Sequence, residues 1–175
     1  MFWSLDREAD HPRAFQQVPT AELSLNGTVG QLIGAPGQGI PIISTVLNIT
    51  RLHSALHGAA GLARALAIAK AFARVRHVGG EHGTLLVENA MHTSTLLTSE
   101  LVSRALMQFA FGLVVLMGKA EALGEARMTE SEQWRLRLLT PVVKAFNSHM
   151  SVRELPCVME ALGGQGYMEE NEIGR

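Results

Sequence analysis

Hydrophobic residues recur with a helical period along most of the chain after about residue 40. Over residues 40–76 they form one apolar stripe at alternating spacings of three and four: Ile49, Leu52, Leu56, Ala59, Ala63 and Leu66. This spacing is typical of a helix that packs along the seam of a bundle. Small residues beside the stripe, such as Gly58 and Gly61, would let another helix approach closely. We expect this helix to end near Gly79 and Gly80, because paired glycines suit a helix C-cap.

Two further long helices are predicted downstream. Residues 85–117 carry the same spacing at Val102, Leu106, Phe109, Leu113 and Leu116. The third helix should begin at the capping box of Thr129 and Glu132 and run to about residue 162. Pro141 and Pro156 should kink or divide it, since each removes a backbone donor. The glycines of residues 163–166 should stop it. Three antiparallel helices predict an up-down bundle, with a fourth helix supplied by later chain or by another subunit.

The first 38 residues follow a different pattern. Residues 21–25 alternate between apolar and polar, Asn26-Gly27 is a strong turn signal, and residues 29–34 could form a return strand. One or two strands have too few partners for a stable sheet. We therefore predict a short β remnant and linker at residues 1–38 and an incomplete helical bundle at residues 39–175, which makes the fold class all-α.

Composition narrows the class of protein. Of 175 residues, 47% are hydrophobic and 18% are charged, which favours surface meant for partners. The net charge of −1 gives no overall basic excess for nucleic acid. Cys157, the lone cysteine, excludes an internal disulfide and is expected to be a buried small hydrophobe. The start lacks signal-peptide features, and the apolar run 105–117 is shorter than the roughly 20 residues of a membrane span. We expect a soluble intracellular protein of unknown organelle.

Four ordered blocks resemble one known family. Residues 160–170 (EALGGQGYMEE) resemble the GGxGY signature of acyl-CoA dehydrogenases, and residues 32–40 (LIGAPGQGI) resemble the join between that family's β-domain and its first C-terminal helix. Residues 48–52 (NITRL) and 72–76 (FARVR) resemble two stretches of the same helix. Residues 18–23 (VPTAEL) and 139–144 (LTPVVK) are similar to the AidB-type, alkylation-response branch. The chain would hold the end of the middle β-domain and most of the C-terminal bundle.

The resemblance implies a site for FAD, shared between neighbouring subunits of a homo-oligomer that acts on an acyl-CoA. It assigns FAD contact to Arg76 and to the glycine loop of Gly163, Gly164 and Gly166, and it places Arg51 near the substrate. A guanidinium suits a pyrophosphate, and glycines allow close approach of the backbone to phosphate. Gly79 stands where the family has phenylalanine, which is a departure from the pattern.

The family's catalytic carboxylate has no counterpart here. It follows the glycine loop in most members, in a stretch that lies after Arg175, and the position used by other members is Thr50. We therefore predict no catalytic residue and no dehydrogenation by this chain alone. Glu169 and Glu170 do not match the base. His53 and His57 lie on one helix face but have no visible third ligand, so no metal is expected.

Two alternatives stay open at this point. The chain could be a non-catalytic helical association module that keeps the bundle interface without the chemistry. A less favoured alternative is a DNA-associated flavoprotein of the AidB type, in which Arg64, Lys70, Arg74 and Arg76 would line one helix.

Overall fold

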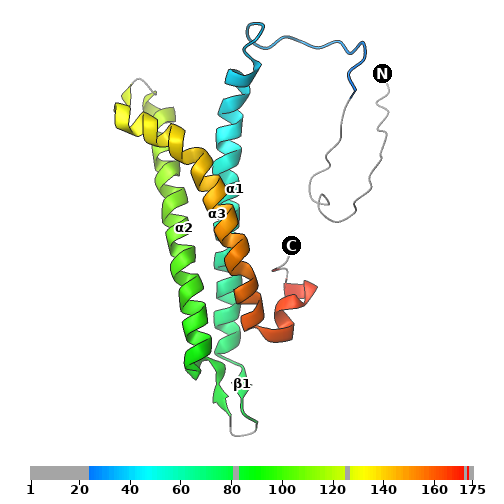
Figure 1. Ribbon diagram of the computed structural model, residues 1–175, viewed down its shortest axis with the longest axis vertical. Coiled ribbons are helices and arrows are strands. Elements are labelled where there is room, and N and C mark those ends of the chain that lie inside the picture. Colours follow the sequence, from blue (N-terminus) through cyan, green and yellow to red (C-terminus); the bar gives the residue numbers. More distant parts are fainter. Residues whose placement is uncertain (1–23, 81–82, 125–126, 172, 174–175) are drawn as a thin grey trace. The chain divides into compact units, whose positions relative to one another are not determined.

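The computed structural model describes residues 24–80, 83–124, 127–171 and 173. Three long helices dominate it: α1 (Gly39–Ala73), α2 (Ala90–Leu123) and α3 (Glu130–Ala161). They run alternately down, up and down, and Figure 1 shows them side by side as an elongated bundle. The predicted all-α, up-down bundle is confirmed. Residues 40–175 form one compact unit, and the N-terminal part of the chain is described separately.

The core lies along the middle of the bundle in two clusters. One cluster joins Leu62, Leu66 and Ala69 of α1 to Leu106 of α2 and Val158 of α3. The other, nearer the start of α1, contains Leu52, Ala55, Ala110, Leu113 and Val143. All five seam residues predicted on α2 belong to these clusters or pack against them: Val102, Leu106, Phe109, Leu113 and Leu116. On α1 the prediction fails at Ile49, which is 48% exposed because the first turns of α1 contribute nothing to either cluster.

Close approach between α1 and α3 depends on Gly58, as predicted, whereas a Cβ at Gly61 would meet nothing within 4 Å. A Cβ at Gly58 would lie 3.1 Å from the Ser151 Oγ, which leaves no room for a larger side chain without movement. Asn147 of α3 lies between the other two helices and is fully buried. Its Nδ2 donates to the backbone oxygens of Leu106 at 3.0 Å and Ala55 at 3.4 Å. One amide therefore ties all three helices together halfway along the bundle.

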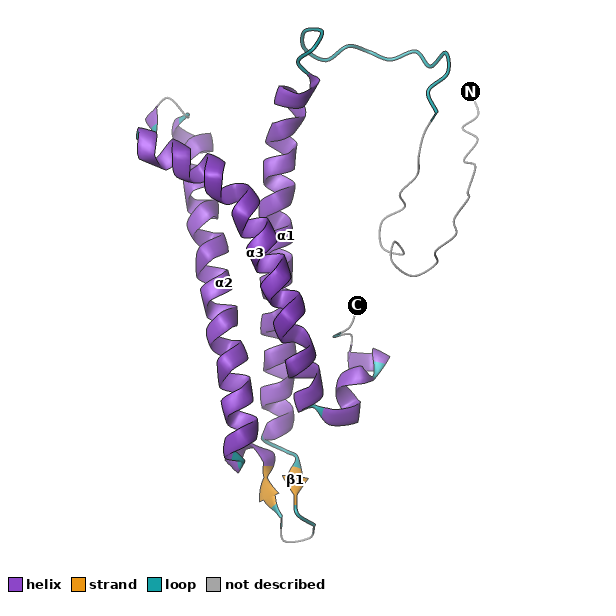
Figure 2. Ribbon diagram, viewed as in Figure 1, coloured by secondary structure: helices purple, strands orange, loops and turns teal. Residues whose placement is uncertain are grey.

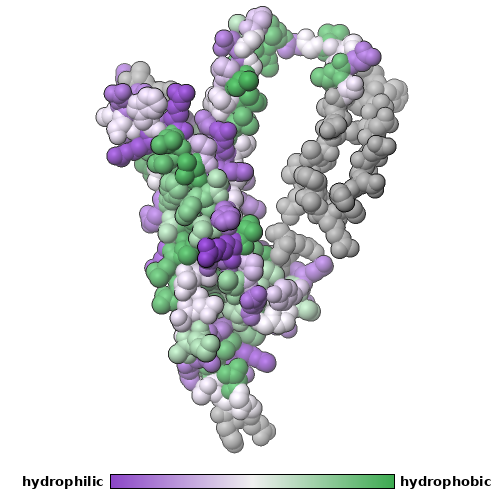
Figure 3. Space-filling model, in the orientation of Figure 1, coloured by the Kyte–Doolittle hydropathy of each residue, from purple (hydrophilic) through white to green (hydrophobic). Residues whose placement is uncertain are grey.

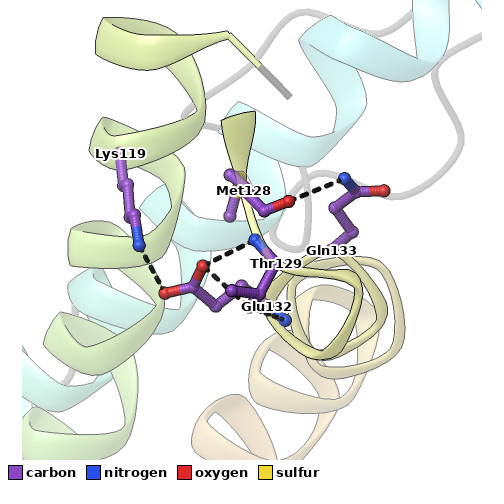
Figure 4. Close-up of polar contacts among 5 residues, drawn as sticks. All are labelled: Lys119, Met128, Thr129, Glu132 and Gln133. Atoms are coloured by element: carbon purple, nitrogen blue, oxygen red, sulfur yellow. Dashed lines mark hydrogen bonds and ion pairs between the residues drawn. The ribbon is translucent and has the colours of Figure 1, made fainter. Parts of the chain in front are cut away.

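The turn from α2 to α3 is held by the predicted capping box. The Thr129 Oγ1 accepts from the Glu132 backbone N–H, and the Glu132 carboxylate accepts from the Thr129 backbone N–H (Figure 4). Lys119 of α2 also reaches this carboxylate, with Nζ 2.6 Å from Oε1. These contacts lower the pKa of Glu132 to about 2, with the Lys119 hydrogen bond as the largest cause. The box thus caps α3 and ties it to α2.

Neither proline divides α3. The helix is continuous through Pro141 and Pro156, and Figure 1 shows it changing direction in its first half, which contains Pro141. Gly163, with φ +62°, ends the helix as predicted, and two short 3₁₀ turns follow, η3 (Gly163–Tyr167) and η4 (Glu169–Asn171). Cys157 is exposed, so its expected burial is wrong: it lies on the outer face of α3.

The end of α1 differs from the sequence prediction. The helix stops at Ala73, three residues before Arg76, and Gly79 and Gly80 do not cap it. Their φ angles of +98° and +82° instead serve a small antiparallel hairpin of β1 (His77–Val78) and β2 (Thr84–Leu85), drawn orange in Figure 2. A 3₁₀ turn, η1 (Leu86–Glu88), then leads to Asn89, whose side chain caps α2.

The predicted β remnant does not form strands in its described part. Residues 24–38 contain bends and a turn but no strand. Gly27 has φ +66°, so the Asn26-Gly27 turn signal is expressed as a bend. Strands need hydrogen-bonded neighbours, and this stretch has none among the described residues. Residues 21–23 of the predicted first strand lie outside the described residues.

Candidate functional site

A cavity of about 720 Å³ opens where the end of α1, the hairpin and the glycine loop meet. It brings together Arg76 with Gly163 and Gly164, residues almost 90 positions apart in the sequence. We call it the Arg76 cavity. Its wall comes from α1, from the hairpin and η1, and from the segment that follows α3: Ile68, Phe72, Arg76, Val78, Leu86, Ala161, Leu162, Gly163, Gly164, Gln165, Met168 and Asn171.

The backbone of Arg76 is fixed on both sides. Its N–H donates to the Phe72 carbonyl at 2.9 Å, and its own carbonyl accepts from the Leu86 N–H at 2.7 Å. The first bond extends the last turn of α1, and the second joins Arg76 to the base of the hairpin. The side chain itself is exposed. The hairpin, which the sequence did not reveal, therefore helps to fix the backbone position from which the Arg76 side chain extends.

The glycines of the loop differ in how much space surrounds them. A Cβ at Gly163 or Gly164 would meet no atom within 4 Å, so the backbone there is accessible to a bound group. Gly166 is different, because it is buried and a Cβ there would overlap the Met159 carbonyl oxygen. Gly166 does not line the Arg76 cavity. Its close approach to the end of α3 is by itself a reason for glycine at this position.

Asn171 closes the loop from the other side. Its Nδ2 donates to the Gln165 backbone oxygen at 2.6 Å, and both residues line the Arg76 cavity. Sequence reasoning missed these two amides and the ring of Phe72. Amide side chains directly beside the glycine loop, together with an aromatic residue one helical turn before Arg76, were the available signals.

The charge of the Arg76 cavity is one-sided. Arg76 is its one formal charge among the described lining residues, none of which is acidic. Gln165 and Asn171 add amide groups, while Ile68, Phe72 and Leu162 add apolar surface. A guanidinium beside open glycine backbone suits phosphate oxygens, and apolar walls suit an aromatic ring. The residues therefore fit the phosphate-bearing part of a dinucleotide.

Arg51 lies in a second cavity of about 590 Å³, the Arg51 cavity, between the first half of α1 and the start of α3. Its Nη1 donates to the Asn48 Oδ1 at 3.0 Å. Across the cavity, the Arg137 guanidinium stacks 5.9 Å from the Trp134 ring centroid. Arg51 and Arg137 make this cavity basic, and sequence reasoning missed both Arg137 and Trp134. At 1.5 Å per residue, about 33 Å of helix separate Arg51 from the end of α1.

The remaining candidates stand apart from both cavities. Thr50, at one family position of the base, hydrogen-bonds with Oγ1 to the Leu47 carbonyl at 3.0 Å. Glu169 and Glu170 lie exposed in η4. The His53 and His57 rings stack 6.3 Å apart on the outside of α1. Among the described residues, no group of three metal-ligating side chains comes together.

Two groups that line neither cavity, Glu100 and His92, also have shifted pKa values. The Lys70 hydrogen bond, followed by that of Arg104, lowers the pKa of Glu100. Lys70 of α1 contacts this carboxylate at 2.6 Å, which connects α1 to α2 and engages one of the four basic residues considered for DNA contact. Burial lowers the pKa of His92, so the neutral ring is favoured there.

Comparison with known proteins agrees with these features. Residues 37–175 match the family model for the acyl-CoA dehydrogenase C-terminal domain. Acyl-CoA dehydrogenase family member 11 of Caenorhabditis elegans is 36% identical over 90% of this chain and 25% of its own length. AidB of Escherichia coli (strain K12) is 30% identical over 89% of this chain and 27% of its own length.

Solved structures show the same fold. The crystal structure of Caenorhabditis elegans ACDH-11 in complex with C11-CoA superposes with a TM-score of 0.74 at 33% identity, covering 81% of this chain and 23% of that one. The apo-form of Bd2924 superposes with a TM-score of 0.79 at 36% identity, covering 90% and 30%. The chain thus spans about a quarter of the length of its curated relatives. Both an AidB and a family member 11 are similar, and the AidB-type branch stays a prediction.

Proposed function

Because this chain belongs to the acyl-CoA dehydrogenase family, through the C-terminal domain of that family, we propose that it forms the FAD-binding helical bundle of a flavin-dependent oxidoreductase acting on acyl-CoA. One observation carries the proposal: Arg76 and the open glycines Gly163 and Gly164 line the same cavity. The family resemblance had marked these residues separately, and the fold brings them together.

Arg76 and the glycine loop would hold the pyrophosphate of FAD. The guanidinium can donate two parallel hydrogen bonds to phosphate oxygens, and the glycine backbone lets those oxygens come close. The amides of Gln165 and Asn171 would orient the polar edge of the bound nucleotide. FAD, when bound, supplies the hydride acceptor for dehydrogenation, and the protein's part is to place and shield it.

The Arg51 cavity would serve the acyl-CoA end of the reaction. Arg51 lies in the first half of α1, about 33 Å along the helix axis from the end of α1 that precedes Arg76. That separation favours an assembly in which the acyl-CoA at the Arg51 cavity of one bundle meets the FAD held by the Arg76 cavity of a neighbouring bundle. A homo-oligomer would then be needed to complete each site. ACDH-11, whose structure contains C11-CoA, makes a fatty acyl-CoA the substrate class to test first.

The chain alone should not dehydrogenate an acyl-CoA. The family position of the base in α1 is Thr50, which carries no carboxylate. Incubating the purified chain with FAD, an artificial electron acceptor and a medium-chain acyl-CoA should give no acceptor reduction. Turnover that depends on FAD would contradict this part of the proposal and would require another base.

FAD binding is the main test of the proposal. We expect FAD titrated into the chain, followed by quenching of flavin fluorescence, to bind at least about tenfold more weakly to Arg76→Ala than to the unchanged chain. Arg74→Ala is the matched control. It also removes one positive charge, two residues from Arg76, but the Arg74 side chain does not line the Arg76 cavity. Equal affinity of the two variants would contradict the assignment of Arg76, as would no binding by the unchanged chain.

A further inference from the structure

The segment that follows α3 turns back on itself and is held at three points. Figure 1 draws it in red, directly after the last turn of α3. Gly166 packs against the Met159 carbonyl, where a Cβ would have no room. Ile173 is 8% exposed and belongs to the core cluster that contains Leu66. Between these two points lies Asn171, whose side chain supplies the third.

Asn171 closes a ring of hydrogen bonds around this turn of the chain. The Gln165 carbonyl accepts from the Met168 N–H at 3.3 Å, and the Met168 carbonyl accepts from the Asn171 N–H at 3.1 Å. The Asn171 Nδ2 then donates back to the Gln165 carbonyl at 2.6 Å. The two backbone bonds do not depend on the type of side chain at position 171, whereas the last bond needs a side-chain donor there. The amide is therefore the specific part of the ring.

The ring of hydrogen bonds lies at the wall of the Arg76 cavity. Gln165 and Asn171 line this cavity together with Gly163 and Gly164. A backbone carbonyl oxygen has two lone pairs, and the Met168 N–H and the Asn171 Nδ2 both donate to that of Gln165. Phosphate oxygens are acceptors too, so a carbonyl that turned toward them would repel them. The ring keeps this acceptor engaged within the protein, which suits a cavity that binds phosphate.

The glycines beside the ring have little of their own to hold their conformation. Gly163 has φ +62°, and a Cβ at Gly163 or Gly164 would meet nothing within 4 Å. Glycine loses more backbone freedom on ordering than any other residue, so such a loop needs a restraint from its neighbours. The outer surface of the segment is mainly hydrophilic to neutral (Figure 3), and Tyr167 is 64% exposed. Apolar packing on that side therefore adds little, whereas the hydrogen bond to Gln165 acts directly beside the glycines.

We propose that Asn171 is a positioning residue, whose amide holds the backbone of residues 163–165 in the form that lines the Arg76 cavity. The inference rests on the proposed function, since the FAD phosphates are the groups that this backbone would serve. A loop that is ordered before binding loses less conformational entropy when the phosphates arrive. Asn171 thus favours binding through the loop, in addition to lining the cavity.

A direct contact between Asn171 and the nucleotide is the alternative role. Since Nδ2 already donates to the Gln165 carbonyl, such a contact would use Oδ1 as an acceptor. The two roles differ in the chain without flavin. A positioning bond restrains the loop before any ligand is present, whereas a contact to the nucleotide leaves the free loop unchanged.

Amide hydrogen exchange without flavin tests the positioning role. In the ¹⁵N-labelled chain, the Met168 amide should exchange about three- to tenfold faster in Asn171→Ala, the range expected for one lost hydrogen bond. Asn171→Asp keeps the shape but not the donor and should behave like Asn171→Ala. Glu170→Ala is the matched control, an exposed neighbour in η4, and should change the rate less than about twofold. An unchanged Met168 rate in both Asn171 variants would overturn the proposal. An equal acceleration at the Leu106 amide, in the core of α2, would show general destabilisation and contradict it as well.

Flavin titrations test which group the loop serves. FAD should bind about three- to tenfold more weakly to Asn171→Ala than to the unchanged chain, whereas riboflavin, which has no phosphate, should lose less than about twofold. Weaker FAD binding with an unchanged Met168 exchange rate would indicate a direct contact and overturn the proposal. FAD affinity that is equal in the two chains would overturn it and leave the proposed function standing. No FAD binding by the unchanged chain would contradict the proposed function, and the Met168 rates would then decide alone whether Asn171 holds the loop.

Discussion

The two ends of the bundle differ in how much of their own structure they complete. At the Arg76 end, the larger core cluster joins all three helices and extends to Leu162 and Ile173 after α3. At the Arg51 end, the first thirteen residues of α1 contain no buried side chain, Ile40 is largely exposed, and Ile43 and Val46 are half exposed. Figure 1 shows the start of α1 standing apart from α2 and α3.

The two cavities differ in the same way, so we call the Arg76 cavity the finished site and the Arg51 cavity the unfinished site. The Arg76 cavity has walls from four segments of the chain, tied by backbone and amide hydrogen bonds. The Arg51 cavity has walls from α1, α3 and the turn before α3, beside apolar surface that needs a cover. We infer that the cofactor's phosphates meet a preformed surface, whereas the substrate end depends on another domain or subunit.

The largest effect should come from the core at the Arg76 end. Leu66 is 1% exposed, and Leu66→Ala should lower the free energy of unfolding by about 2–5 kcal/mol through lost burial and a cavity. Ile49→Ala, a comparable truncation in the same helix at the Arg51 end, should lower it by less than about 1 kcal/mol because Ile49 is half exposed. Urea denaturation followed by circular dichroism measures both. Equal losses would show that the two ends are equally packed.

Two glycines sharpen the account of the finished site. Gly166→Ala should destabilise the chain by about 1–3 kcal/mol and weaken FAD binding, because its Cβ would overlap the Met159 carbonyl. Gly164→Ala should leave the thermal melt almost unchanged and still weaken FAD binding, since its Cβ would enter the open cavity. Comparing the two variants separates an effect on FAD binding caused by filling the cavity from one caused by destabilising the chain. A Gly164→Ala chain that binds FAD as well as the unchanged chain would show that the loop does not contact the cofactor.

The smallest effect is electrostatic and belongs to the Arg51 end. The contacts of Lys119 and Thr129 lower the pKa of Glu132 to about 2 in the folded chain, below its value of 4.5 in the absence of these contacts. Folding therefore favours the carboxylate, and its stabilising contribution is present above pH 4.5 and lost as the pH falls toward 2. Glu132→Gln should flatten the decline in melting temperature over this window. A variant that declines as steeply as the unchanged chain would contradict the assignment of this part of the decline to Glu132.

The sequence could predict what depends on neighbours along the chain. The seam of α2, the capping box at Thr129 and the stop at Gly163 follow from periodicity and local hydrogen bonding, and the structure confirms each. Ile49 follows the same periodicity and is nevertheless exposed, because burial also requires a facing helix. Hydrophobic periodicity identifies the apolar face of a helix, but it does not show whether another element packs on that face.

Other failures arise where one residue type serves several conformations. Positive φ at Gly79 and Gly80 suits a helix cap and a hairpin equally, and only the pairing of His77 with Leu85 decides between them. The hairpin in turn fixes Arg76 through the Leu86 N–H, a contact that no local pattern reveals. The family resemblance could mark Arg76 and Gly164, but only the fold placed them around one cavity with Gln165 and Asn171.

Amide chemical-shift mapping with FAD tests the central claim most directly. Titrating FAD into the ¹⁵N-labelled chain should shift the amides of Arg76, Gly163, Gly164 and Asn171, while those of Asn48 and Arg51 stay in place. That result would locate the cofactor at the finished end of the bundle. Shifts confined to Asn48 and Arg51, with none at the glycine loop, would contradict the account and move the flavin to the opposite end.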